Sequence, residues 1–259
     1  MRRPVPLIAY ILLLALVYFA AAKLGLSLAA LHSNVTPVWP PTGIAIASLL
    51  MFGRRVWPGV FLGALVANVL TDIPAGSAVG IAIGNTLEAL AAFWLLQRVR
   101  WRNSLDSVAD VMRFVGCAAI LAPMVSATIG SVSLGLGNPA EWAKFWSIWL
   151  TWWIGDGFGA LIVAPFILSW RWPGESNAEH GVEIAVLLLL HLLVVMIVFG
   201  GWFPGPVKTY PLAYLSLPFL LWAALKFDLR IVTSAIVLMA SVAVWGAKHN
   251  YGPWVQASP

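Results

Sequence analysis

Charged side chains are scarce in this chain: Asp, Glu, Lys and Arg make up only 10% of its 259 residues. An average soluble domain carries about 25% charged residues. Such a small number of charges cannot cover a water-exposed surface, and 61% of the residues are hydrophobic, with a mean hydropathy of +0.90. Lipid is therefore the expected solvent for most of the chain, and we predict an all-α membrane protein because helices satisfy their own backbone hydrogen bonds.

Cysteine is nearly absent, and motifs for catalysis are missing. The single cysteine, Cys117, excludes an intramolecular disulfide and a cysteine metal motif. We find no phosphate-binding glycine loop, no zinc-ligand spacing and no nucleophile with a base at a recognisable interval. The sequence therefore predicts no enzyme activity, no cofactor and no metal in this chain.

A long hydrophilic stretch is also missing, so we predict one integral membrane sensory domain over 1–259, without a soluble effector domain. The net charge of +5 is interpreted as a signal for membrane orientation and not as nucleic-acid binding.

Nine apolar segments predict a polytopic fold of about eight to ten transmembrane helices. The second and third segments are short for a full span, so they are expected to be tilted, partly re-entrant or extended by their flanks. The nine segments are roughly 5–31, 40–52, 57–71, 77–97, 109–136, 144–170, 181–201, 210–225 and 230–246.

The positive charges predict a cytoplasmic N-terminus in a bacterial inner membrane. With this orientation, eleven basic residues fall inside and four outside, and every arginine is inside. Nine spans would leave residue 259 outside, so a cytoplasmic effector would need one further span before it. The inner set is Arg2, Arg3, Arg54, Arg55, Arg98, Arg100, Arg102, Arg113, Arg171, Lys226 and Arg230; the outer set is Lys23, Lys144, Lys208 and Lys248.

Small residues recur at a spacing that lets helix backbones approach closely in membranes. These glycine pairs are interpreted as helix-packing positions: Gly59 with Gly63, Gly80 with Gly84, and Gly155 with Gly159.

Ionisable groups within apolar segments are costly, and they usually face a partner or a water-filled cavity. Glu88, Asp156, His191 and Lys23 qualify by position. Lys23 is predicted to be the intramembrane charge partner of one carboxylate. Asn85 lies three residues before Glu88, so the two share a helix face and could form a ligand site, a proton site or an interhelical clamp. His191 is more typical of a hydrogen-bonded core histidine than of a metal ligand.

Asp156 follows a tryptophan-rich helix face, which suggests a sensing site. Trp149 and Trp152 fall on the same side of the predicted helix as Asp156. We hypothesise that these three residues line a pocket toward the outer leaflet, with Asn85 and Glu88 across it. Aromatic walls with a few polar groups are typical of small-ligand sites, and they would favour a cationic ligand over an anionic one. The alternative is that the tryptophans only pack between helices and that Asp156 fixes their register.

Five motifs, in order, resemble those of the MASE-one family, the first membrane-associated sensor domain of bacteria. The match runs from about residue 38 to 254. The motifs are Val38-Trp39-Pro40-Pro41-Thr42-Gly43-Ile44-Ala45, Trp57-Pro58-Gly59-Val60-Phe61-Leu62-Gly63-Ala64, Gly84-Asn85-Thr86-Leu87-Glu88-Ala89, Trp152-Trp153-Ile154-Gly155-Asp156-Gly157-Phe158-Gly159 with Ala164-Pro165, and Tyr210-Pro211-Leu212 followed by Leu221-Trp222-Ala223-Ala224-Leu225-Lys226-Phe227.

The resemblance implies a sensory input domain that passes a ligand, partner or membrane signal to a cytoplasmic module. Its expected partners are the lipid bilayer and a histidine kinase, diguanylate cyclase or phosphodiesterase, fused or separate, in two-component or cyclic-di-GMP signalling. A small-molecule ligand and a homodimer are further expectations. The alternative function is a small-molecule transporter or a transporter-like binding protein, because buried carboxylates beside broken helices also suit ion-coupled transport.

Overall fold

The computed structural model describes residues 6–28, 38–102, 105, 107–171, 180–202 and 212–252, and no strand occurs within these ranges. The predicted all-α class is therefore confirmed. Arg2, Arg3, Lys208, Tyr210 and Pro211 lie outside the described residues. The chain forms two compact units, unit 1 over Met1–Leu168 and unit 2 over Ser169–Pro259, and each is described by itself.

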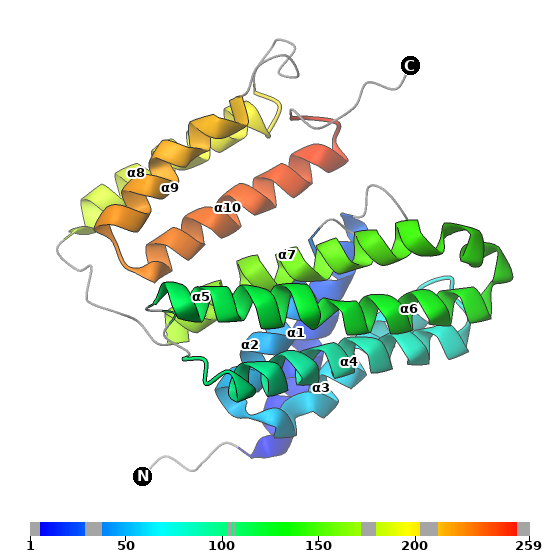
Figure 1. Cartoon of the computed structure of the whole chain (residues 1–259). Coiled ribbons are helices and arrows are strands. Elements are labelled where there is room, and N and C mark those ends of the chain that lie inside the picture. The colour runs from blue at the N-terminus through cyan, green and yellow to red at the C-terminus, as the bar shows by residue number, and fades with distance from the viewer. Residues whose placement is uncertain are drawn as a thin grey trace. The chain divides into compact units, whose positions relative to one another are not determined.

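The helices coincide with the nine predicted apolar segments, but fewer of them are long enough to cross a membrane. Within the described ranges, six helical stretches meet that length and hydropathy, and the shorter apolar helices Pro40–Phe52 and Leu212–Lys226 accompany them, so the nine predicted segments are a loose count of the spans. The second and third segments are helices of only 13 residues each. The elements, labelled in Figure 1, are α1 (Leu7–Ser27), α2 (Pro40–Phe52), α3 (Trp57–Val69), α4 (Ala75–Arg98), α5 (Val108–Phe114), α6 (Pro123–Gly137), α7 (Phe145–Arg171), α8 (Gly181–Val198), α9 (Leu217–Lys226) and α10 (Leu229–Lys248).

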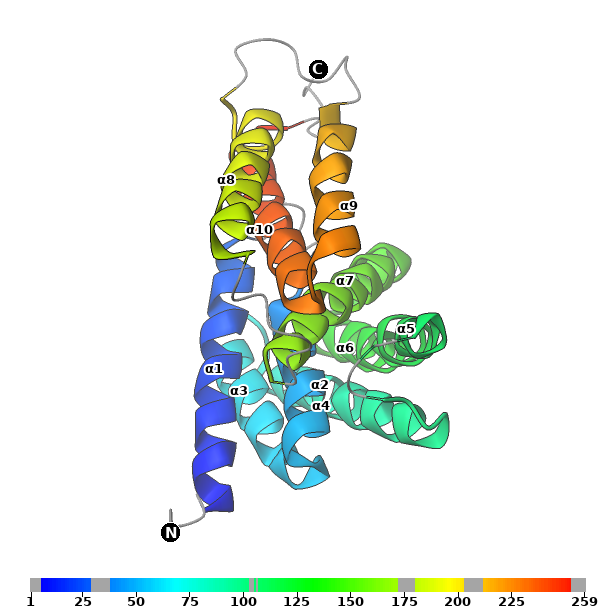
Figure 2. The same ribbon diagram turned by 90° about the vertical axis from the view of Figure 1, so that its left-hand side faces the viewer.

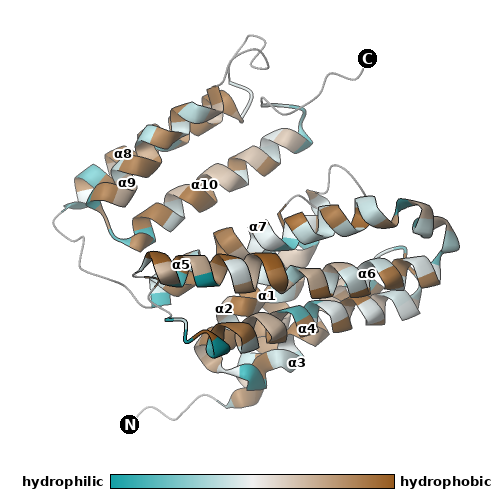
Figure 3. Ribbon diagram, in the orientation of Figure 1, coloured by the Kyte–Doolittle hydropathy of each residue, from teal (hydrophilic) through white to brown (hydrophobic). Residues whose placement is uncertain are grey.

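The outer faces of the helices are apolar, as lipid requires. Leu12, Leu13 and Leu16 of α1 are 58%, 58% and 64% exposed. Hydrophobic residues cover most of each helix, while hydrophilic residues gather mainly near the helix ends (Figure 3). Broad exposed apolar faces of this kind are unfavourable in water, so the fold agrees with a membrane environment.

Proline and glycine define the short helix α2. Pro40 and Pro41 occupy its first turn, where a missing N–H costs little. Gly53 follows its last residue with φ of 82°, a conformation that favours glycine, and ends the helix. The sequence thus encodes a helix of 13 residues, about 20 Å long, shorter than the hydrocarbon core.

The predicted glycine pairs lie at helix–helix contacts. A Cβ atom on Gly59 would be 2.6 Å from the backbone oxygen of Ile11, and one on Gly63 would be 2.7 Å from that of Ala15, so α3 packs backbone to backbone on α1. Gly84 of α4 lies against the side chain of Ile129 on α6, where an added Cβ would be 3.2 Å from the Ile129 Cβ. The close packing of α4 and α6 is visible in Figure 1.

Arginine-bearing helix ends of unit 1 gather at one end, which we call the arginine end. The rings of Tyr10, near the start of α1, and Phe52, at the end of α2, are 4.7 Å apart. A cavity of about 540 Å³ is lined by Phe52, Gly53, Arg54, Arg55, Phe93 and Gln97, so the α2–α3 turn meets the last turns of α4. Trp101 and Phe114 then join the end of α4 to α5, with ring centroids 5.5 Å apart. This grouping agrees with the predicted cytoplasmic side.

A π-helical stretch, Val115–Leu121, joins α5 to α6 in one continuous span. Pro123 cannot donate to the carbonyl four residues before it, which leaves the Ala119 oxygen without that bond. Helix α7 packs at this irregularity: the Trp153 indole donates to the Ile120 oxygen at 2.8 Å. A Cβ on Gly157 would lie 2.7 Å from the Ala119 oxygen. Backbone irregularity in a span is tolerated where neighbouring helices cover it.

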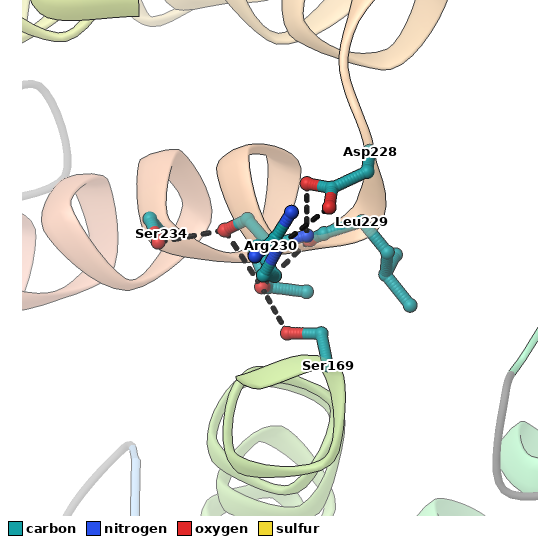
Figure 4. Close-up of polar contacts among 6 residues, drawn as sticks. Ser169, Asp228, Leu229, Arg230 and Ser234 are labelled. Carbon is teal, nitrogen blue, oxygen red and sulfur yellow. Dashed lines mark hydrogen bonds and ion pairs between the residues drawn. The ribbon is translucent and has the colours of Figure 1, made fainter. Parts of the chain in front are cut away.

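Unit 2 holds α8, α9 and α10 side by side (Figure 2). Asp228 caps α10, where its carboxylate accepts from the Arg230 backbone N–H at 3.1 Å and pairs with the Arg230 guanidinium (Figure 4). Ser169 and Thr233 hydroxyls share a hydrogen bond of 3.0 Å. His191 is fully buried, with Nε2 3.3 Å from the Ala235 oxygen, which agrees with the core histidine predicted from sequence.

Candidate functional site

The first turn of α2 meets the middle of α7. The Trp39 N–H, just before α2, donates to the Gly155 oxygen at 2.9 Å. A Cβ on Gly43 would lie 2.6 Å from Val163 Cβ, and a Cβ on Gly159 would overlap the Trp39 carbonyl. Because only glycine fits at these two contacts, the first and fourth sequence motifs dock directly against each other. This contact places the side chain of Thr42, the residue just before Gly43, opposite that of Asp156.

Four helices of unit 1 converge on a small group of polar side chains. The Thr42 hydroxyl lies 2.9 Å from Asp156 Oδ1 and 3.5 Å from Glu88 Oε2. The Ser126 hydroxyl donates to Asp156 Oδ2. We call Thr42, Asn85, Glu88, Ser126 and Asp156 the polar centre. It ties α2, α4, α6 and α7 together through side chains that are far apart in the sequence.

The polar centre is closed to solvent and incompletely satisfied. Asp156 and Ser126 are 0% exposed, and Glu88 is 1% exposed. Oxygen atoms Glu88 Oε1 and Asn85 Oδ1 have no hydrogen-bond partner. Buried polar atoms are nearly always bonded, because an unmade bond in a low-dielectric interior is costly. One of these oxygens belongs to a carboxyl group that lies beside a second buried carboxyl group, that of Asp156. The site is therefore a place where a positive charge or a hydrogen-bond donor would be favourable.

No basic side chain supplies that charge among the described residues, since none forms a salt bridge with Glu88 or Asp156. The sequence-predicted partner Lys23 lies elsewhere: its Nζ is 3.5 Å from the Leu70 oxygen, at the end of α3. The two carboxyl groups lie within hydrogen-bonding reach of each other. Like charges at such a separation repel, so ionising both carboxyl groups in this closed site is costly unless a cation is present. The positive end of the α2 dipole also faces them.

The structure brings together four of the sequence-predicted site residues, Asp156, Glu88, Asn85 and Trp152, because the Trp152 side chain lies within hydrogen-bonding reach of Asp156. Both tryptophans also take packing positions along α7. Trp152 is 8% exposed and packs on Gly130, where a Cβ would be 2.5 Å from its ring. The Trp149 indole donates to the Thr128 hydroxyl at 3.0 Å. The two described cavities lie elsewhere, one at the arginine end and one of about 370 Å³ lined by Trp57, Phe61, Ile83, Thr86, Leu87 and Leu90.

Sequence reasoning missed the two hydroxyl donors, Thr42 and Ser126, and the buried Tyr18. The Tyr18 phenol on α1 is 1% exposed and lies near Asn85 and Trp39. Thr42 could have been found from its position in the first motif. Nothing in the sequence around Ser126 or Tyr18 distinguishes them from other small or aromatic residues of a membrane helix.

Comparison with known proteins identifies a family for this arrangement. The MASE1 family profile matches residues 11–258, almost the whole chain. The chain is also 25% identical over 261 residues to the probable diguanylate cyclase DgcE of Escherichia coli K12. That alignment covers 99% of this chain but only 22% of the relative, so the chain corresponds to a minor part of that protein. No solved structure matches the chain. The motifs, the membrane helices and the profile match agree, and the chain belongs to the MASE1 family of membrane sensor domains.

Proposed function

We propose that this chain is the membrane-embedded sensory input of a bacterial signalling protein, and that the polar centre is its sensing position. The observation that supports this most directly is the convergence of four helices on two buried carboxyl groups, which no basic side chain of the described residues neutralises. The output is a cytoplasmic module of cyclic-di-GMP turnover or a histidine kinase. The first of these is favoured by the diguanylate cyclase relative.

Helix α2 provides a physical route for the signal. Its first turn carries Thr42 in the polar centre, and its last residue, Phe52, lies at the arginine end against Tyr10. A helix of 13 residues moves as a rigid rod of about 20 Å. A change in charge at the polar centre alters the attraction for this helix and shifts its packing. A sensor can change its output only through different affinities for two packings, and the polar centre supplies that difference.

The experiment is a chimera in which this chain replaces the aligned segment of the Escherichia coli relative. Cellular cyclic-di-GMP is measured for the chimera, for the relative without any membrane segment, and for chimeras carrying Asp156→Asn or Thr86→Val. Thr86 is a matched control because its buried hydroxyl bonds only to its own helix, at the Ala82 oxygen. Immunoblots of membrane fractions report the amount of each protein.

We expect Asp156→Asn to change cyclic-di-GMP at unchanged protein level, while Thr86→Val leaves it as in the parent chimera. Equal cyclic-di-GMP in the parent and the Asp156→Asn chimera, both inserted normally, would show that the polar centre is not a sensing position. Equal output with and without the membrane segment would refute the sensory role itself.

Transport is the second candidate function, and the short helix α2 is the observation that favours it. Transporters point the N-termini of broken helices at anionic groups near mid-membrane, and the first turn of α2 contacts a buried carboxyl group here. A transporter would move its substrate in a vesicle without any output module. Uptake of a radioactive cation by vesicles that contain the purified chain would support this candidate, and binding without uptake would support the sensor.

A further inference from the structure

The atoms of the polar centre that could coordinate a cation are all oxygens. They are the carboxylates of Glu88 and Asp156, the hydroxyls of Thr42 and Ser126, and the amide oxygen of Asn85. Hard cations prefer such ligands, whereas softer metals select nitrogen and sulfur. The two unpartnered oxygens, Glu88 Oε1 and Asn85 Oδ1, belong to side chains that are at least nine-tenths buried. Both side chains project from α4 one helical turn apart, so a cation bound against that face could satisfy both oxygens.

The burial of the site favours an ion over an organic ligand. Asp156 and Ser126 have no exposed surface, and neither of the described cavities is lined by a residue of the polar centre. An organic ligand would therefore have to separate α2 from α7, where Gly43 and Gly159 hold the backbones in contact. A bare or nearly bare cation needs only small movements of the hydroxyl and carboxyl groups.

The charge of the site favours a monovalent ion. Two carboxyl groups that share one proton carry a net charge of −1, which a single monovalent cation neutralises. Calcium sites use six to eight oxygens, and magnesium usually keeps several waters that this closed site has no room for. Among the described residues, no group of three or more His, Cys, Asp or Glu side chains occurs that would indicate a divalent site.

We propose that the polar centre binds one Na⁺ in exchange for one proton. In the ion-free state both carboxyl groups are protonated; when Na⁺ binds, one proton leaves, and the net charge of the site stays zero. The cation is the ligand of the sensing position described above, so this signalling role rests on the proposed function, whereas binding to the purified chain does not.

The other ionisable groups around the site have different partners or tasks. On α1, Tyr18 faces the site, while Lys23 bonds to Leu70. On α5, Asp110 pairs with Arg113 at 2.9 Å. The buried thiol of Cys117 lies in the adjoining π-helical stretch. The exchange is therefore assigned to Glu88 and Asp156. Because each bound Na⁺ releases one proton, the apparent affinity for Na⁺ should rise about tenfold for each unit by which the pH is raised.

The test uses the purified chain in detergent. Its thermal unfolding temperature is followed by tryptophan fluorescence in NaCl, KCl, CaCl₂ and choline chloride at constant ionic strength. A ligand that binds only the folded state raises this temperature with its concentration. We expect NaCl to raise it above choline chloride, and more so at alkaline than at acidic pH. Asp156→Asn, Glu88→Gln and Ser126→Ala should weaken this shift, whereas Thr86→Val should retain it.

Retention of radioactive sodium by the wild-type protein on a size-exclusion column gives a direct measurement that does not depend on any variant folding. Absence of retained sodium together with equal unfolding temperatures in all salts would overturn the proposal. A shift that persists in Asp156→Asn and Glu88→Gln would also overturn it, as would a response to CaCl₂ alone. If the cyclic-di-GMP output of the chimera depends on the membrane segment but does not respond to sodium, the proposed sensory function is retained and only its link to the cation is refuted.

Discussion

Replacing Thr42 with valine removes one hydroxyl from the polar centre and almost nothing else. Valine has nearly the same shape and the same β-branching, so it fits the first turn of α2. The lost bond is the 2.9 Å contact to Asp156; the 3.5 Å contact to Glu88 is weaker, and one hydroxyl proton can serve only one of them at a time. Removing the donor leaves a buried carboxyl oxygen unsatisfied, which costs about 1–3 kcal/mol.

We therefore expect Thr42→Val to lower the free energy of unfolding by about 2 kcal/mol, at the centre of that range. The matched control is Thr86→Val on α4, at a threonine that is 5% exposed and bonds to the Ala82 oxygen of its own helix at 2.7 Å. Such bonds back to a helix carbonyl add little stability, so the control should be nearly neutral. Unfolding by sodium dodecyl sulfate in mixed micelles measures both variants. Equal losses in the two variants would refute the role assigned to Thr42.

Three further predictions concern packing, charge and topology. Gly43→Ala should lower the free energy of unfolding by about 2 kcal/mol or more in the same micelle assay, because the added Cβ would overlap α7. Gly76→Ala should be neutral or stabilising, because nothing lies within 4 Å of its added Cβ. Lys23→Met should lower the free energy of unfolding only slightly, because the Lys23 ammonium contacts a backbone oxygen, and removing either buried carboxyl group should not recover that loss. Recovery in a double-mutant cycle would instead support the charge pair suggested by the sequence. Reporter fusions at Asn138 and at Asn103, which lies outside the described residues, should report periplasm and cytoplasm respectively, and the opposite result would reject the orientation.

The sequence was sufficient to predict the helices of this fold because lipid leaves few alternatives. Each apolar segment had to be helical to satisfy its backbone, and all nine coincide with helical elements. The number of full spans could not be predicted in the same way. Pro40 and Pro41 mark the start of helix α2, but its position beside α7 depends on the bond from the Trp39 N–H to the Gly155 oxygen, a contact made across a large distance in sequence. Hydropathy describes each segment alone, so it cannot show that the first turn of α2 lies beside the middle of α7.

The carboxyl groups of the candidate site could be predicted from the sequence, whereas its hydroxyl groups could not, and the difference has a physical cause. Carboxyl groups in an apolar run are expensive, so Glu88 and Asp156 are conspicuous in the sequence. Hydroxyl groups are not, because a serine or threonine in a membrane helix can bond to a carbonyl of its own preceding turn. Thr86, Thr128 and Ser133 do this here.

Only tertiary structure decides which hydroxyl groups turn away from their own helix. Thr42 has two prolines before it in the first turn of α2, so its side chain points out of the helix start toward α7. Ser126 follows the π-helical stretch and Pro123, where α6 restarts beside Asp156, and its hydroxyl reaches Asp156 more closely than it reaches the Pro123 oxygen of its own helix, which is 3.2 Å away. Both donors thus sit where a helix begins inside the bundle. A search for buried carboxyl sites in other membrane sequences should therefore look for hydroxyl residues within one turn after an intramembrane proline, since such residues are freest to leave their own helix.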